Sequence, residues 1–174
     1  MLTKFVPDKY QKSIYTINYK KLKREGIKCI LFDLDNTLVP TSVDTPDKKL
    51  INQINDIKAL GFKIIIMSNS PKSRVAPFQK GLLVDAAAFA LKPKKDKYEK
   101  ILKTYKYKEK EVCSIGDQIV TDIFGSNRMG ITSIYVNPMG TKDFFATVFN
   151  RFLEKKILKR LAKKDLFLKE RYYD

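Results

Sequence analysis

The chain contains no histidine, and this absence excludes more chemistry than any other feature of its composition. Serine–histidine and cysteine–histidine nucleophiles, acid–base catalysis by imidazole and histidine-ligated metal sites all require that side chain. Any catalysis must therefore use carboxylates, lysines and hydroxyl groups.

Cysteine and long apolar runs are also scarce. The only two cysteines, Cys29 and Cys113, each begin an apolar stretch, which favours buried free thiols in a reducing compartment over a disulfide. No stretch approaches the roughly 20 apolar residues of a membrane span, and the first residues lack the apolar centre of a signal peptide. We expect a cytoplasmic protein whose contact with a membrane, if it has one, is peripheral and at the inner face.

Acidic residues are few relative to basic ones. The chain has 35 lysines and arginines against 19 aspartates and glutamates, for a net charge of +16. Residues 1–28 carry +6 and residues 142–174 carry +5, so most of the excess lies at the two ends. Such a charge attracts polyanions, which leaves nucleic acid, ribosomes and anionic lipid head groups open as partners. The oligomeric state is left open as well.

Short apolar runs alternate with segments of helical spacing through the middle of the chain. We predict strands at residues 29–32, 62–67, 86–89, 112–115 and 131–136. Helices are predicted from Pro46-Asp47 to Gly61, over 94–105 and over 119–129. This alternation predicts a single Rossmann-like α/β domain, with a parallel sheet covered by helices on both faces. Its core should span about residues 27–140, between a basic segment 1–26 and an amphipathic basic segment 142–174.

The apolar pattern of the C-terminal segment changes phase near residue 154. One stripe is formed by Phe144, Phe145, Val148, Phe149, Phe152 and Leu153. Ile157, Leu158 and Leu161 then fall on a different face. Because residues of an α-helix turn by about 100° each, we predict two amphipathic helices, or one that breaks near residue 154. The stripe packs on the core or contacts a membrane, and the sequence leaves both open.

Polar side chains that can do chemistry follow four of the predicted strands. They are Asp33, Asp35 and Thr37 after the first, Ser68 and Asn69 after the second, Lys92 after the third, and Asp117 and Asp122 after the fourth. Ligands bind beyond the carboxyl ends of parallel strands. One carboxylate of an aspartate pair can attack phosphorus while the other passes a proton to the leaving oxygen. Such a pair also attracts a divalent cation.

Each of these motifs also has a purely structural explanation. The first aspartate pair can cap a strand–helix turn, and Ser68 can supply a turn-forming hydroxyl. Lys92 can be a surface lysine, and Asp122 can stabilise the first turn of its helix. The order of the motifs along the chain favours the chemical interpretation.

The four motifs, in this order, resemble the haloacid-dehalogenase superfamily of phosphatases, whose pattern is DxDxT, then Ser/Thr, then Lys, then GDxxxxD. The resemblance covers about residues 29–136. It implies that Asp33 is the nucleophile and Asp35 the general acid and base. It also implies a set of phosphate-binding residues, namely Ser68, Asn69 and Lys92.

The same resemblance implies Mg²⁺ as the cofactor. The metal would be held by Asp33, Asp117 and the backbone carbonyl of Asp35. Thr37 and Asp122 would support this site from outside the ligand set, with Asp122 orienting metal-bound water or Lys92. The metal would offset the repulsion between an anionic nucleophile and an anionic phosphate.

A closer resemblance lies in the flanking stretches. Phe5-Val-Pro7, Ser68-Asn-Ser70 and Gly116-Asp-Gln118 look like the bacterial YqeG family, which is related to mitochondrial phosphatidylglycerophosphate phosphatases. This resemblance implies a phosphorylated substrate, and phosphatidylglycerophosphate, a membrane lipid, is the first hypothesis. A nucleic-acid- or ribosome-associated module and a phosphatase of small phosphometabolites are the alternatives. The intervals between the motifs are too short for a cap domain, so the crevice should admit a phosphate carried on something large.

Overall fold

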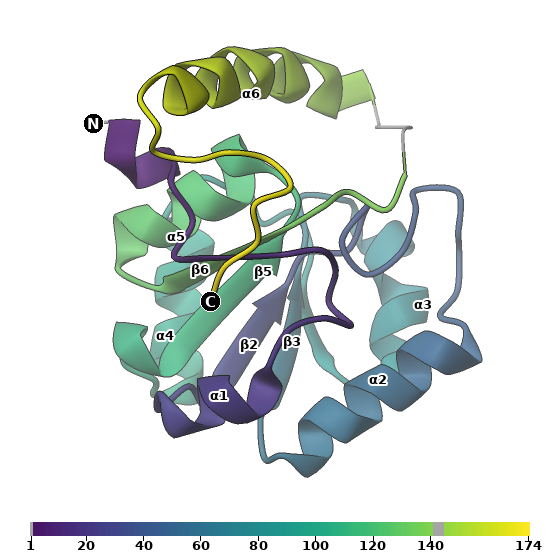
Figure 1. Ribbon diagram of the computed structural model, residues 1–174. Coiled ribbons are helices and arrows are strands. Elements are labelled where there is room, and N and C mark those ends of the chain that lie inside the picture. Colours follow the sequence, from purple (N-terminus) through teal and green to yellow (C-terminus); the bar gives the residue numbers. More distant parts are fainter. Residues whose placement is uncertain (1, 141–144) are drawn as a thin grey trace.

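Six parallel strands form one sheet within the residues that the structure describes (Figure 1). This computed structural model describes residues 2–140 and 145–174, and it gives residues 145–149 by their backbone only. The strand order is β1-β6-β5-β2-β3-β4. The strands are β1 (Lys9–Gln11), β2 (Cys29–Phe32), β3 (Lys63–Met67), β4 (Asp85–Ala87), β5 (Val112–Gly116) and β6 (Thr132–Val136). Since every pairing in the sheet is parallel, the predicted Rossmann-like α/β fold is confirmed.

Helices cover both faces of the sheet because the central strands are apolar on both faces. In β2, Ile30 and Phe32 face one buried cluster, while Cys29 and Leu31 face another. The first cluster packs against the first three helices, and the second packs against α4. The helices are α1 (Tyr19–Arg24), α2 (Lys48–Ala59), α3 (Lys72–Leu82), α4 (Asp96–Tyr105), α5 (Phe124–Met129) and α6 (Phe145–Lys163). Shorter turns are η1 (Leu2–Phe5), η2 (Glu109–Glu111) and the π-helical turn η3 (Ile119–Ile123).

The boundaries of α2 follow from its capping residues. The carboxylate of Asp47 accepts a hydrogen bond from the Leu50 N–H at 2.7 Å, which satisfies a free donor of the first turn. Gly61 ends the segment with a φ of +85°, a conformation that glycine adopts without steric cost. Both ends lie where the sequence predicted them.

The predicted strand at 86–89 is displaced. β4 begins at Asp85 and ends at Ala87, and Phe89 has already left the sheet with a φ of +47°. The apolar character of Ala88 and Phe89 therefore has a cause other than strand formation.

The N-terminal segment contributes an edge strand that the sequence did not indicate. β1 pairs with β6, and Tyr10 is fully buried with its ring 5.2 Å from that of Tyr135. The C-terminal tail returns to the same edge, where the backbones of Tyr10 and Tyr173 exchange hydrogen bonds. A strand of three residues with one apolar side chain carries too little periodicity to be predicted.

The prediction of two C-terminal helices, or of a break near residue 154, is wrong. α6 runs without interruption from Phe145 to Lys163. Its inward face is the row Arg151, Glu154, Leu158 and Leu161, at helical spacing, and two members of that row are charged. Glu154 is buried, whereas Phe152 of the predicted stripe is largely exposed. Phe144 lies outside the described residues, as do the side chains of Phe145, Val148 and Phe149.

No extra domain interrupts the region that carries the motifs. From Asp35 to Ser68 the helices and strands are α2 and β3, and from Ser68 to Lys92 they are α3 and β4. Among the described residues, no helix has the length and apolar character needed to cross a bilayer.

Candidate active site

The predicted site residues gather where the central strands end. β2 lies between β3 and β5, and Phe32 is in register with Ile66 on one side and Ile115 on the other. Asp33 therefore leaves the sheet between the segments that carry Ser68 and Asp117. The carboxyl ends of parallel strands form the crevice in which ligands of such sheets bind.

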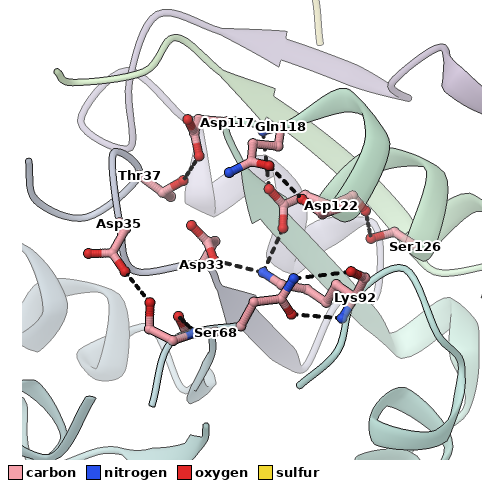
Figure 2. Close-up of polar contacts among 12 residues, drawn as sticks. Asp33, Asp35, Thr37, Ser68, Lys92, Asp117, Gln118, Asp122 and Ser126 are labelled. Carbon is pink, nitrogen blue, oxygen red and sulfur yellow. Dashed lines mark hydrogen bonds and ion pairs between the residues drawn. The ribbon is translucent and has the colours of Figure 1, made fainter. Parts of the chain in front are cut away.

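Lys92 forms two ion pairs inside this crevice. Its Nζ lies 2.7 Å from Oδ1 of Asp33 and 2.6 Å from Oδ1 of Asp122, as Figure 2 shows. All three side chains are buried. Burial alone would lower the pKa of Lys92, but the carboxylates of Asp122 and Asp33 outweigh it and raise that pKa. The lysine is thus a permanent positive charge beside Asp33.

The backbone of Lys92 is held by Asn69. The Asn69 amide donates to the Lys92 carbonyl at 3.0 Å and accepts from the Lys92 N–H at 2.7 Å. This reciprocal pair connects the end of β3 to the loop after β4. The side-chain amide of Asn69 thereby fixes the position from which the lysine reaches Asp33.

Three buried carboxylates provide a potential metal site. Asp33, Asp117 and Asp122 each offer an oxygen, and these oxygens all lie within 4.8 Å of one another. Burial raises the pKa of Asp33 to about 7, and the charges of Asp122 and Asp35 add to this effect while Lys92 opposes it. Burial likewise raises the pKa of Asp117, against the opposing charge of Arg151. These carboxyl groups resist ionisation because they are buried close together. A divalent cation bound to their oxygens would stabilise the ionised form.

The segment after β5 is shaped to bring Asp122 into this cluster. The Asp122 carboxylate lies over the N-terminus of the π-helical turn η3. There its Oδ2 accepts a hydrogen bond from the Gln118 N–H at 3.1 Å. Gly116 leaves room for that carboxyl group, which a Cβ at this position would overlap. The Thr37 hydroxyl donates a hydrogen bond to Oδ1 of Asp117 at 3.1 Å and so orients the Asp117 carboxylate.

Asp35 lies apart from the cluster. Figure 2 shows its carboxylate on the side of Asp33 away from Lys92. Arg74 of α3 donates to Oδ1 from Nη2 at 2.8 Å and from Nε at 3.0 Å, and the Ser70 hydroxyl donates to Oδ2 at 2.6 Å. Arg74 also contacts the backbone carbonyl of Val43, so it ties Asp35 to the loop that precedes α2. The sequence analysis missed this arginine.

A second arginine reaches the site from α6. Arg151 donates to the Asp117 carbonyl at 3.0 Å and forms an ion pair with the Asp117 carboxylate. It also pairs with Glu154, which accepts from the N–H of Ile119 at the start of η3. These contacts explain why the inward face of α6 carries charge. In the sequence, the only sign of these contacts is the change near residue 154 in the helical face that the apolar residues occupy.

Comparison with known proteins identifies the family. The sequence model described as mitochondrial PGP phosphatase matches residues 3–139. The chain belongs to this family. It is 37% identical over 165 residues to the probable phosphatase YqeG of Bacillus subtilis (strain 168), an alignment that covers 94% of this chain and 96% of that protein. The family predicted from the motifs is therefore confirmed, and by family the chain is a phosphatase.

A plant relative is longer than this chain. Phosphatidylglycerophosphate phosphatase 1, chloroplastic/mitochondrial, of Arabidopsis thaliana is 27% identical over 165 residues. The match covers 89% of this chain and 47% of that protein. This member of the PGP phosphatase family thus spans about half the length of its plant relative.

Solved structures share the α/β fold of this chain. An uncharacterized protein from Listeria monocytogenes serotype 4b aligns with a TM-score of 0.53 at 19% identity, over 75% of this chain and 99% of that one. The cobalt-bound deoxy-D-mannose-octulosonate 8-phosphate phosphatase of Haemophilus influenzae aligns with a TM-score of 0.50 at 15% identity, over 83% and 95%. At these identities the likeness concerns the fold alone.

The close approach at Gly116 generates a first prediction. Gly116→Ala should lower the free energy of unfolding by about 1–3 kcal/mol, because the new methyl group displaces the Asp122 carboxyl group. It should also weaken the stabilisation that added Mg²⁺ provides in urea denaturation. Gly130→Ala is the control: Gly130 has a φ of +70° and no neighbour within reach of a Cβ. That control should lose stability through backbone strain while keeping its response to Mg²⁺. Equal responses in both variants would contradict the role given to Gly116.

The raised pKa of Asp33 generates a second prediction, for protein in EDTA. The pKa is about 7 in the folded chain against an ordinary 3.8. Between these values the folded state holds a proton that the unfolded state has lost, so the free energy of unfolding should fall as pH rises from about 4 to about 7. Asp33→Asn should flatten this dependence in urea denaturation. Added Mg²⁺ should stabilise the protein more at pH 8 than at pH 6. Stability in EDTA that rises over the same range would contradict the assignment.

Proposed function

We propose that this chain hydrolyses the terminal phosphomonoester of phosphatidylglycerophosphate through an aspartyl-phosphate on Asp33. The observation that carries the proposal is the position of Asp33, directly after β2, with the Lys92 ammonium 2.7 Å from its carboxylate. An anionic nucleophile next to a fixed cation is the arrangement that attack on a phosphate dianion requires.

Two displacements at phosphorus complete the proposed reaction. In the first, a carboxylate oxygen of Asp33 forms a bond to phosphorus while the bond to the substrate alcohol breaks, and Asp35, in its protonated form, gives its proton to the leaving oxygen. In the second, water attacks the same phosphorus, Asp35 takes the proton from the water, and inorganic phosphate leaves as the Asp33 carboxylate is restored. The phosphoryl oxygens would be bound by Lys92 and by the buried Ser68 hydroxyl.

Asn69 receives a different role from the one that the resemblance implied. Its amide is engaged at both ends by the backbone of Lys92. We therefore assign it to positioning Lys92 rather than to binding phosphate.

Mg²⁺ is the proposed cofactor, held by Asp33, Asp117 and the backbone carbonyl of Asp35. The oxygen-only donor set fits this cation better than Zn²⁺, which favours nitrogen and sulfur ligands. When bound, Mg²⁺ supplies positive charge that offsets the repulsion between nucleophile and phosphate. Thr37 orients Asp117, and Asp122 orients Lys92, in keeping with the 3.1 Å and 2.6 Å contacts that they make.

A lipid-borne substrate is supported by three observations. Relatives in the family carry the name phosphatidylglycerophosphate phosphatase. The segments between Asp35 and Lys92 hold no inserted domain that could enclose a small metabolite. The net charge of +16 suits peripheral binding to an anionic membrane, which we propose at the inner face.

The proposed reaction predicts how substrates and variants rank. With Mg²⁺, turnover of phosphatidylglycerophosphate in mixed micelles should exceed that of nucleotide and sugar phosphates. Asp33→Asn should reduce it to the level without enzyme, and EDTA should remove activity that Mg²⁺ restores. Phosphate release measured across this panel is the test. Full activity in Asp33→Asn would rule out the mechanism, and a preference for nucleotides would rule out the substrate.

The Arg74–Asp35 ion pair predicts a dependence on the leaving group. Asp35→Asn should slow hydrolysis of an alkyl phosphate by about 10²–10⁴-fold, since it loses proton transfer. The loss should be smaller for p-nitrophenyl phosphate, whose leaving group needs little protonation. Arg74→Gln should slow hydrolysis of the alkyl phosphate by about tenfold, and hydrolysis of p-nitrophenyl phosphate by less. About tenfold is the loss expected when a positioned group loses one charge-assisted hydrogen bond. Arg74→Lys should recover part of the rate.

Arg24→Gln, which removes an exposed arginine at the end of α1, serves as the control and should match the unmodified protein on both substrates. Equal losses on the alkyl and aryl substrates in Arg74→Gln would show that Arg74 supports the fold and not the proton transfer.

A further inference from the structure

Several segments that carry site residues also carry large apolar side chains that are not buried. Phe89, Leu91 and Phe152 are each more than half exposed, at 57%, 56% and 53%, and Met139 is 42% exposed. Single exposed apolar residues are ordinary on protein surfaces, but several on segments next to one site are characteristic of an interaction surface.

Each of the four lies next to a residue of the site or its surroundings, two through a backbone hydrogen bond and two through their position in the chain. The Phe89 N–H donates to the Ser70 carbonyl at 3.0 Å, and Leu91 directly precedes Lys92. The Met139 N–H donates at 2.8 Å to the carbonyl of Asn36, the residue after Asp35. Phe152 directly follows Arg151, which contacts Asp117. We call Phe89, Leu91, Met139 and Phe152 the apolar rim.

The loop that carries Lys92 holds its two rim residues in an unusual conformation. Phe89 and Leu91 have φ values of +47° and +56°, in the left-handed region that bulky side chains rarely adopt. Ala90 and Lys92 are buried between and after them, so the loop points alternate residues inward and outward. Inserting Lys92 requires the inward positions only. The outward positions would accept polar residues equally well, so the fold itself does not explain their apolar character.

Lysines accompany the apolar rim. Lys94 is exposed, and its N–H donates to the Leu91 carbonyl at 2.9 Å. Lys155 and Lys156 are exposed on α6, where the Lys156 ammonium lies 4.4 Å from the centre of the Phe152 ring. Aromatic and aliphatic side chains next to lysines match a bilayer, whose apolar interior lies beneath anionic head groups.

We infer that the apolar rim inserts into the surface of an anionic bilayer, with Phe89 and Leu91 as the leading residues. The inference rests on the proposed function, because it places the mouth of the site against the layer in which a lipid phosphomonoester lies. Asp33 and Lys92 would then meet the head group without extraction of the lipid. The lysines would provide attraction at a distance, and the rim would provide the contact that salt does not screen.

The absence of tryptophan from the chain makes a direct test of insertion available. Phe89→Trp and Leu83→Trp each introduce a single tryptophan, which can be excited apart from the tyrosines, at an exposed apolar position. Leu83, 81% exposed, lies just before β4, at the amino ends of the parallel strands, whereas the site lies at their carboxyl ends. With vesicles of phosphatidylglycerol and phosphatidylcholine, Phe89→Trp should shift its emission to the blue and be quenched by brominated acyl chains. Leu83→Trp should show neither change.

Loss of binding provides the second measurement. The double variant Phe89→Ser, Leu91→Ser should bind the same vesicles more weakly in sedimentation, by about tenfold for each apolar side chain removed. Leu83→Ser should bind like the unmodified protein. Circular dichroism and urea denaturation of each variant establish that it is folded.

Binding is measured without substrate, so the two proposals can fail separately. Vesicle binding through the rim with no hydrolysis of phosphatidylglycerophosphate would overturn the proposed substrate and leave the docking face. Hydrolysis of that lipid in vesicles, with equal signals from the two tryptophan variants, would overturn the docking face and leave the phosphatase. If the double serine variant instead changes the oligomeric state in the absence of vesicles, the rim is a contact between copies of this chain and the inference is wrong.

Discussion

The buried ion pairs of Lys92 are the interaction on which the rest of the site depends. The ammonium group lies between the carboxylates of Asp33 and Asp122, and all three side chains are buried. Removing one partner from such a group leaves charge buried without compensation, which typically costs about 3–5 kcal/mol. The surrounding features hold either the lysine or a partner in place: the Asn69 amide fixes the backbone of Lys92, and Gly116 makes room for Asp122.

Two cations approach the carboxylate cluster from parts of the chain that are far apart. Lys92 comes from the loop after β4, and Arg151 comes from α6 to pair with Asp117. Even so, burial leaves the pKa values of Asp33 and Asp117 raised, so the folded chain by itself does not fully stabilise the ionised cluster. A divalent cation would supply the missing charge. The same requirement explains the two charged residues on the inward face of α6, which apolar residues could not replace.

The loop before Lys92 connects the interior of the site with its surface. Its alternating residues place a charge inside the crevice and apolar groups outside it, within a span of four residues. The proposed lipid substrate would require both, because the nucleophile must be held beside a fixed charge while the opening of the site meets the bilayer. No inserted domain lies between β2 and β4 to cover that opening.

The amino-acid sequence by itself determined the central strands, the capped helix α2, the family and the order of the motifs at the strand ends. The strands and the helix are local features, since each depends on periodicity or capping within about ten residues, and the family follows from short motifs read in their order along the chain. Only the tertiary structure decided which charges meet. Arg74 pairs with Asp35 across 39 positions, and Arg151 contacts Asp117 across 34, and no periodic pattern encodes either pair. The continuity of α6 was hidden for the same reason: charged residues occupy its inward face, and they are buried there only because the folded sheet presents carboxylate and backbone partners to them.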